Sequence, residues 1–206
     1  MTHLIFFCGH AGTGKTTAAK RLVGPLMRST GAPFCLLDKD TLYGPTGAAA
    51  IGALTGNPHD RDSPLYLQHL RDPEYRGLID TARENLALGV SVAVVAPLSR
   101  EVRERKLVDR AWLGVASDVT IRVVWVFASE AVAHQRIAER GHPDDAYKLA
   151  NWDTYRERRF EPADDIRGDL LMFDSTSPGA ADYDALLAQL VGAPPFTGTM
   201  LPPLPV

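Results

Sequence analysis

The segment that decides the fold is Leu4-Ile5-Phe6-Phe7-Cys8-Gly9-His10-Ala11-Gly12-Thr13-Gly14-Lys15-Thr16, residues 4–16. Its first five residues form a continuous apolar run, which is typical of a strand buried on both faces of a sheet. The next eight match the pattern Gly-x4-Gly-Lys-Thr, and a helical pattern follows them. A glycine loop between a strand and a helix predicts a site that wraps the phosphates of a nucleotide.

The residue types in this loop suit that chemistry. Backbone N–H groups must surround a triphosphate, so the chain has to turn tightly without a Cβ in the way, as glycine allows. We expect Lys15 to bridge the β and γ phosphates and Thr16 to ligate Mg²⁺, at the positive end of the following helix. The predicted nucleotide-binding residues are Gly9, His10, Ala11, Gly12, Thr13, Gly14, Lys15, Thr16 and Thr17.

Length and composition indicate an ordinary globular protein. The 206 residues suit one domain, which we expect to span residues 1–191, followed by a proline-rich tail over 192–206. Apolar residues make up 45% and charged residues 23% of the chain. The chain has neither an apolar run long enough for a membrane span nor a signal-peptide pattern, and this predicts a cytoplasmic protein.

Four further apolar runs predict the remaining strands. They cover 34–37, 90–96, 121–127 and 170–173, and helical segments separate them. Continuous apolar character is what parallel strands need when helices cover both faces of their sheet. The predicted fold class is therefore α/β, with a five-stranded parallel sheet between two layers of helices.

Helix signals give approximate bounds for the covering layers. The predicted helices cover 16–23, 73–89, 130–140, 144–159 and 181–190, the first ended or kinked by Gly24-Pro25 and the third capped by Ser129. The segment from about 43 to 72 is rich in Gly, Pro and Asp, which predicts loops and short helices. Such segments commonly recognise substrates, so we expect this one to do so.

Two carboxylates end the second predicted strand, in Leu36-Leu37-Asp38-Lys39-Asp40. Ligands bind beyond the carboxyl ends of parallel strands, so this pair should share a cleft with the glycine loop. Here the chain resembles the small P-loop kinases, such as shikimate, gluconate and adenylylsulfate kinases, chloramphenicol phosphotransferase and the zeta toxins. The resemblance implies that Asp38 helps to hold Mg²⁺ and that Asp40 orients or deprotonates the acceptor hydroxyl. From the residues alone, both could instead be turn or cap residues.

The same families carry arginines on a mobile helical lid after the fourth strand, and the matching segment here is about 136–160. Arg136 and Arg140 are four residues apart, so they share a helix face, and the resemblance implies that both neutralise the transferring phosphoryl group. Solvated helix charges are the alternative. The segment Phe173-Asp174-Ser175-Thr176 resembles the loop that packs beside adenine in these kinases, which implies that Thr176 contacts the nucleotide. Arg61 and Arg100 are predicted to contact the substrate.

Together these features predict an ATP- and Mg²⁺-dependent kinase that transfers the γ-phosphoryl group to a hydroxyl of a small molecule. An antibiotic or other metabolite, a sugar or sugar acid, and a nucleotide sugar remain open as acceptors. The chain lacks the Asn-Lys-x-Asp pattern of GTPases and the Leu-Ser-Gly-Gly signature of transporter ATPases. Oligomeric state and the choice between ATP and GTP are left open.

Two alternatives come from other functional classes. A polynucleotide 5′-kinase would use the same loop, but the formal charge of −3 argues against a nucleic acid as the main partner. A nucleotide-dependent regulatory ATPase would need no acceptor pocket, and the pair Asp38 and Asp40 argues against it.

Overall fold

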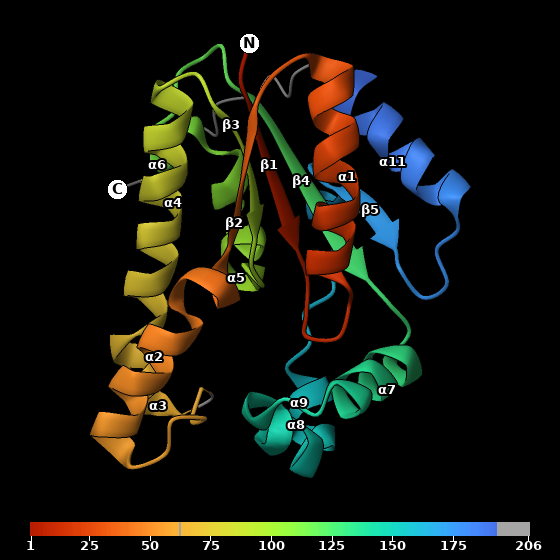
Figure 1. Cartoon of the computed structure of the whole chain (residues 1–206). Helices are drawn as coiled ribbons and strands as arrows, with labels where there is room; N and C mark the ends of the chain where they lie inside the picture. The colour runs from red at the N-terminus through yellow and green to blue at the C-terminus, as the bar shows by residue number, and fades with distance from the viewer. Residues whose placement is uncertain (62, 193–206) are drawn as a thin grey trace.

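A single parallel sheet forms the centre of the molecule (Figure 1). The computed structural model describes residues 1–61 and 63–192. The strands are β1 (His3–Cys8), β2 (Phe34–Asp38), β3 (Ser91–Val95), β4 (Thr120–Phe127) and β5 (Leu171–Asp174), in the order β2-β3-β1-β4-β5. The predicted α/β class and five-stranded parallel sheet are confirmed, and each predicted strand bound is within one residue.

Two layers of helices cover the sheet, one on each face. Helices α1 (Lys15–Thr30) and α11 (Ala180–Gly192) lie on one face, and α4 (Arg71–Ala87), α5 (Ser99–Arg103) and α6 (Arg110–Leu113) lie on the other (Figure 1). Alternate residues of β1 enter opposite cores: Leu4, Phe6 and Cys8 pack toward α4, and Ile5 and Phe7 toward α1. This two-sided burial explains why the strand sequence is continuously apolar.

Helix α1 continues through Gly24-Pro25 to Thr30, so the prediction that the helix ends at this pair is wrong. Proline inside a helix costs about 3 kcal/mol because it lacks a donor and clashes with the preceding turn. Leu22 and Leu26, on either side of the proline, are both buried in the core. Each such burial contributes about 1.5–3 kcal/mol, which is enough to hold the helix together.

The predicted irregular segment 43–72 is largely helical, so that prediction is wrong for its first half. Helix α2 (Lys39–Thr55) runs through Pro45 and has Gly56 as its C-cap, and α3 (Pro64–His69) follows. Asp38 caps α2, because one of its carboxylate oxygens accepts from the N–H groups of Asp40 (2.9 Å) and Thr41 (3.3 Å). A strong N-cap and burial of Ile51 outweigh the weak helix propensity of the sequence.

The predicted lid contains one regular helix and several short turns. Helix α7 (Glu130–Arg140) has the predicted bounds and the predicted cap, Ser129. The predicted helix 144–159 is instead the 3-10 turn η2 (Pro143–Asp145), α8 (Ala146–Ala150) and α9 (Trp152–Glu157), with Asn151 interrupting the helical backbone.

Two short elements complete the chain, η1 (Lys106–Val108) and α10 (Asp164–Arg167). Residues 193–206 of the predicted proline-rich tail lie outside the described residues, and Gly192 still belongs to α11. Within the described part of the chain, no helix is both long and apolar enough to cross a bilayer.

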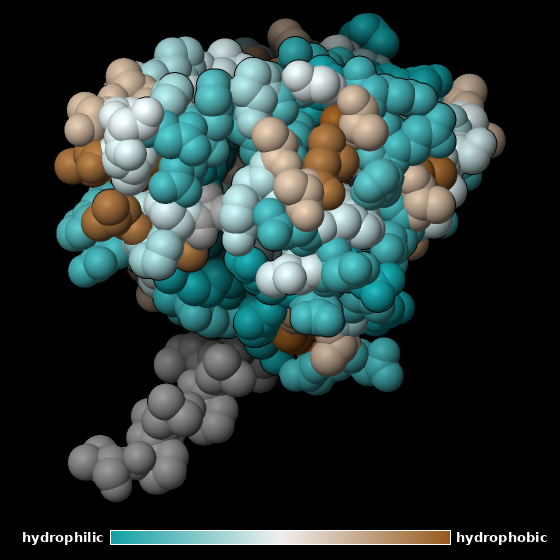
Figure 2. All heavy atoms as spheres, turned by 90° about the horizontal axis from the view of Figure 1, so that it is seen from below, coloured by the Kyte–Doolittle hydropathy of each residue, from teal (hydrophilic) through white to brown (hydrophobic). Residues whose placement is uncertain are grey.

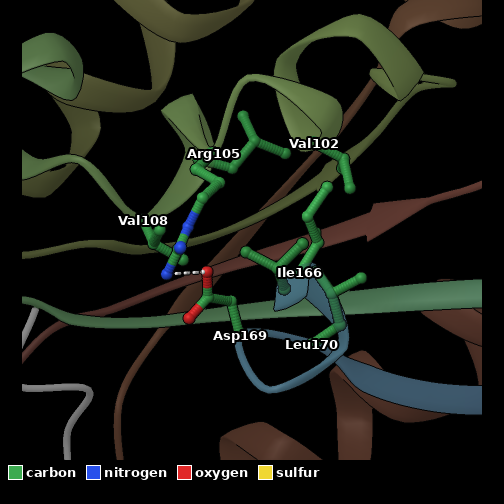
Figure 3. Close-up of a pocket in the computed structure, with 8 residues that line it drawn as sticks. Val102, Arg105, Val108, Ile166, Asp169 and Leu170 are labelled. Carbon is green, nitrogen blue, oxygen red and sulfur yellow. Dashed lines mark ion pairs between the residues drawn. The ribbon is translucent and has the colours of Figure 1, made fainter. Parts of the chain in front are cut away.

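A small void between η1 and α10 is a packing feature and not a ligand site. Figure 3 shows Arg105 reaching Asp169 across it, with 2.7 Å between Nη2 and Oδ2. Its volume is about 10 Å³, which is room for one water molecule at most.

Candidate active site

The backbone of the glycine loop requires glycine at specific positions. Gly9, Gly12 and Gly14 have φ angles of +138°, +76° and +78°, which other residues rarely adopt. A Cβ on Gly9 would lie 2.1 Å from the carbonyl oxygen of Val126, and one on Gly12 would lie 2.5 Å from that of Ala133. The loop is therefore pressed against the end of β4 and the start of α7.

Lys15, the first residue of α1, folds back over the loop. Its Nζ donates a hydrogen bond to the carbonyl oxygen of His10 at 2.6 Å, and the hydroxyl of Thr13 donates to the same oxygen at 2.9 Å. Desolvation lowers the pKa of Lys15 to about 8, although Asp40 and other nearby groups partly oppose the shift. Its ammonium group is thus held within the loop without full hydration. Thr17, also predicted to bind nucleotide, is exposed on the first turn of α1.

Thr16 and Asp38 lie together at the carboxyl edge of the sheet. The Thr16 hydroxyl donates to Asp38 Oδ2 at 2.8 Å, while Oδ1 of the same carboxylate caps α2. Both groups offer oxygen ligands, which Mg²⁺ prefers, and Mg²⁺ commonly completes its shell with water and substrate phosphates. No cluster of three or more His, Cys, Asp or Glu among the described residues could hold a metal by itself. The donor set therefore fits Mg²⁺ bound together with a nucleotide.

The start of the loop also binds the predicted lid. The N–H of Ala11 donates to the Tyr155 hydroxyl at 3.2 Å, and His10 Nε2 lies 2.7 Å from the carbonyl oxygen of Phe160. Because that carbonyl can only accept, the ring proton of His10 is assigned to Nε2. Desolvation lowers the pKa of His10 to about 4, against the opposing hydrogen bond to Phe160, so the imidazole is neutral at pH 7.

A large cavity lies between the loop, α2 with α3, and the predicted lid. Figure 2 looks onto this end of the molecule and shows a mainly hydrophilic, hollowed surface. The cavity volume is about 730 Å³, a size that suits a small metabolite. Its polar walls come from the following side chains, among others: His10, Lys39, Asp40, His59, Arg61, Tyr66, Arg71, Tyr75, Arg140, His142, Asp144, Asp145, Lys148 and Tyr155.

Three of the six residues predicted to act in catalysis or to bind substrate line this cavity, and Lys15, Arg100 and Arg136 do not. Asp40, Arg61 and Arg140 face it. Arg100 lies outside its lining and pairs with Asp72 at the start of α4, so the structure does not support its predicted contact with substrate. The short helix α5 turns this side chain outward, a direction that the sequence pattern did not reveal.

Arg136 and Arg140 bind different partners in the structure. Arg136 donates to the carbonyl oxygens of Ser175 (2.7 Å) and Thr176 (3.3 Å), next to the glycine loop. Arg140 instead pairs with the buried carboxylate of Asp145, at 2.8 Å from Nε and 2.6 Å from Nη2. The joint action of the two arginines on a phosphate stays a prediction.

Thr176 lies beside a second cavity at the ends of β4 and β5. This cavity has a volume of about 450 Å³, and Ser129, Arg156 and Arg159 also line it. The N–H of Ser129 donates to the Thr176 hydroxyl at 2.9 Å. This bond fixes the start of α7 to the loop after β5, where Arg136 also binds.

Lys39 is a site residue that the sequence analysis missed. Its side chain is only 6% exposed, and Nζ lies 3.1 Å from Glu74 Oε2, 3.2 Å from the Tyr66 hydroxyl and 3.5 Å from Asp40 Oδ1. Desolvation opposes its charge, but Tyr75, Tyr66, Asp40 and Glu74 together raise its pKa above the usual range. The only sequence signal is its place between two aspartates, and lysines are usually exposed.

A known protein family matches the part of the chain that carries this site. Residues 4–162, from β1 through the predicted lid, match the family model described as AAA domain. The chain belongs to the AAA domain family. The matched part of this AAA domain includes the glycine loop, Asp38, Asp40 and most of the cavity wall. No curated protein matches the chain.

Solved structures share the fold of this AAA domain over nearly its whole length. A gluconokinase from Sinorhizobium meliloti is 20% identical, with a TM-score of 0.54 over 92% of this chain and 91% of that one. An APS kinase from Mycobacterium tuberculosis, in complex with AMPPNP and APS, is 19% identical, with a TM-score of 0.56 over 93% and 98%. Kti12 from Chaetomium thermophilum, in complex with ADP-AlF3, is 19% identical, with a TM-score of 0.61 over 91% and 96%. At these identities the likeness shows the fold, which is that of P-loop kinases and related nucleotide-binding proteins.

Proposed function

We propose that this protein is an ATP- and Mg²⁺-dependent kinase that acts on a hydroxyl of a small molecule. The observation that carries this proposal is that the start of the glycine loop and Asp40 line the same cavity of about 730 Å³. A nucleotide on the loop would present its γ-phosphate to a molecule bound in that cavity. The shared fold with a gluconokinase and an APS kinase supports the same reaction class. A cytoplasmic location suits the free thiols of Cys8 and Cys35.

The roles of the residues follow from what phosphoryl transfer needs, which is mainly positioning and neutralisation of charge. Lys15 would contact the phosphates, and Thr16 and Asp38 would hold Mg²⁺, which supplies positive charge to them. The acceptor oxygen forms a bond to the γ-phosphorus as the bond to the β–γ bridging oxygen breaks. The hydroxyl proton goes to Asp40, whose side chain is 79% exposed toward the cavity and solvent.

Two arginines would act at different ends of the nucleotide. Arg140 faces the cavity and would neutralise the transferring group, while Asp145 holds it in position. Arg136 lies with Thr176 near the second cavity, and this supports a nucleoside site at the ends of β4 and β5. Separate roles of this kind suit two arginines that have different partners.

The test is transfer of the labelled γ-phosphate of ATP, with Mg²⁺, to a panel of antibiotics, sugars, sugar acids, nucleotide sugars and an RNA oligonucleotide. Lys15→Ala is the blank. Asp40→Asn should lower transfer by at least about 100-fold, the usual contribution of a general base, while ATP affinity changes little. Transfer that survives Asp40→Asn would remove Asp40 from the mechanism. Transfer of label to the oligonucleotide, with none to the small molecules, would indicate a polynucleotide kinase.

A regulatory ATPase is the second candidate, since the chain also shares its fold with Kti12 in complex with ADP-AlF3. In that case the protein would release free phosphate without labelling any acceptor. Asp40→Asn would then leave the rate of phosphate release unchanged, since no acceptor hydroxyl needs a base.

A further inference from the structure

A carboxylate of the predicted lid is bound by two basic residues on the opposite wall of the large cavity. Asp144 Oδ1 lies 2.6 Å from His59 Nδ1, and Asp144 Oδ2 lies 3.2 Å from Arg61 Nε. His142 Nδ1 is 3.8 Å from the same Oδ2. All four residues line the cavity. The arrangement is that of an anion held between an arginine and histidines, with the anion supplied by the protein itself.

Arg61 is fixed in place independently of Asp144. Its side chain is 10% exposed, and Nη2 donates to the carbonyl oxygen of Gly44 at 2.6 Å. A Cβ on Gly47 would lie 3.2 Å from Nη2, so glycine at this position leaves room for the guanidinium. Nε is buried and forms no hydrogen bond of good geometry, although it lies near Asp144. A planar group with a spare buried donor is well suited to an incoming anion.

Lys39 and Arg71, on the same wall of the cavity, are each paired with a buried glutamate. Lys39 pairs with the buried Glu74 at 3.1 Å, and Arg71 forms a two-point pair with the buried Glu101, at 3.0 Å for each contact. Arg61 differs, because the carboxylate facing it comes from across the cavity. If the lid segment moves, Asp144 leaves and the positive charge of Arg61 is exposed to a ligand.

We propose that His59 and Arg61 bind an anionic group of the phosphoryl acceptor, and that Asp144 occupies this site when no acceptor is bound. This inference rests on the proposed kinase function and adds the acceptor class: a hydroxylated organic anion bearing a carboxylate or a phosphate monoester. Its hydroxyl would reach Asp40 in the same cavity, and its anionic group would displace Asp144.

The experiment measures γ-phosphate transfer by the full chain to paired acceptors that differ in charge. Sorbitol is paired with gluconate, glucose with glucose 6-phosphate, and an extract of small metabolites is split by anion exchange into neutral and anionic fractions. Label should enter anionic acceptors, and the gluconate and glucose 6-phosphate arms distinguish carboxylate from phosphate. Slow ATP hydrolysis without acceptor reports whether each variant is folded and binds nucleotide.

Two variants should change the acceptor KM in opposite directions. Arg61→Gln should raise KM by at least about 30-fold, as expected for loss of one partner of a buried ion pair, with a smaller effect on kcat. Asp144→Asn should lower KM several-fold, because the competing carboxylate is gone. The matched control is Arg83→Gln, which removes an exposed pair with Asp80 on α4 and should change neither constant.

Several outcomes would overturn the inference. Label in a neutral acceptor, or an anionic acceptor indifferent to Arg61→Gln, would show that the site does not select charge. A higher KM in Asp144→Asn, parallel to that in Arg61→Gln, would show that the contact only holds the lid segment. Phosphate release with neither fraction labelled would defeat the proposed kinase function, and this inference with it.

Discussion

At the scale of single residues, the charge state of Lys15 makes nucleotide binding depend on pH. Desolvation lowers its pKa to about 8 in the free protein. Anionic phosphates favour the ammonium form, so the pKa in the complex must be higher, and binding takes up protons when Lys15 starts partly neutral. Affinity for AMPPNP should therefore fall as the pH rises above 8, by at most about tenfold per pH unit. Calorimetric titration at pH 8.5 in buffers of different ionisation enthalpy measures the uptake directly.

The control for this prediction is Lys15→Arg, whose guanidinium stays charged over the same range. In this variant, residue 15 takes up no proton on binding, so it should add no buffer-dependent contribution to the binding enthalpy. If the native protein takes up no protons at pH 8.5, the pKa of Lys15 is not lowered by desolvation in the free protein.

Gly12 offers a second prediction at this scale. Gly12→Ala places a Cβ 2.5 Å from the carbonyl oxygen of Ala133 at a φ of +76°. The positive φ alone costs about 1–2 kcal/mol, and α7 must also shift. Gly31→Ala is the matched control, because its φ is +67° but nothing lies within 4 Å of its added Cβ. Chemical denaturation should show a larger loss of stability for Gly12→Ala than for Gly31→Ala, and equal losses would contradict the close approach of α7.

At the scale of elements, the buried pair Lys39 and Glu74 joins α2 to α4. Glu74 also accepts from the Tyr66 hydroxyl at 2.8 Å, so α3 belongs to the same junction. Lys39→Met should destabilise the protein by about 3–5 kcal/mol, because it leaves a carboxylate buried without its cation. The double variant Lys39→Met with Glu74→Leu should recover much of this loss in denaturant unfolding. If the double variant were as unstable as the single one, lost packing rather than the unpaired charge would be responsible.

Helix α1 provides a prediction about its internal proline. Pro25→Ala removes the cost of about 3 kcal/mol that proline has in a helix interior. The greater conformational entropy of the unfolded chain with alanine opposes this gain by up to about 1 kcal/mol. The variant should therefore be more stable by about 2 kcal/mol in thermal or denaturant unfolding. A less stable variant would mean that the helix is built around the proline ring. Ala32, which is partly exposed beyond the helix, is changed to Ser as the control.

At the scale of the whole molecule, the strands were predictable because a strand that is buried on both faces needs a continuous run of apolar residues, and such runs are visible in the sequence. The positive-φ glycines of the loop and the position of Asp38 beside Thr16 were also predictable, because both follow from short sequence patterns at the ends of strands. The burial of Lys39 was not, because it depends on Glu74, 35 residues further along the chain. The contact of Arg61 with Asp144 joins segments 83 residues apart, and only the fold brings them together.

The same scale allows a test of the proposed single domain, residues 1–191. Both cores share β1, and α11 packs against α1, so we expect one cooperative unfolding transition. AMPPNP with Mg²⁺ at 100 times its Kd should stabilise the fold by about 2.7 kcal/mol, a shift of roughly 5–11 °C in Tm. Scanning calorimetry measures both, with Lys15→Ala as the control. Two transitions, only one of which moves with nucleotide, would show separate folding units.

The strand order has a consequence for how the protein is made. β2 lies at the edge of the sheet, and β3 separates it from β1, so the hydrogen bond between Thr16 and Asp38 spans a strand that is synthesised later. A growing chain on the ribosome therefore exposes the glycine loop and Asp38 before anything fixes the spacing between them. We expect nucleotide to have no native site to bind until Ser91–Val95 has left the exit tunnel and entered the sheet.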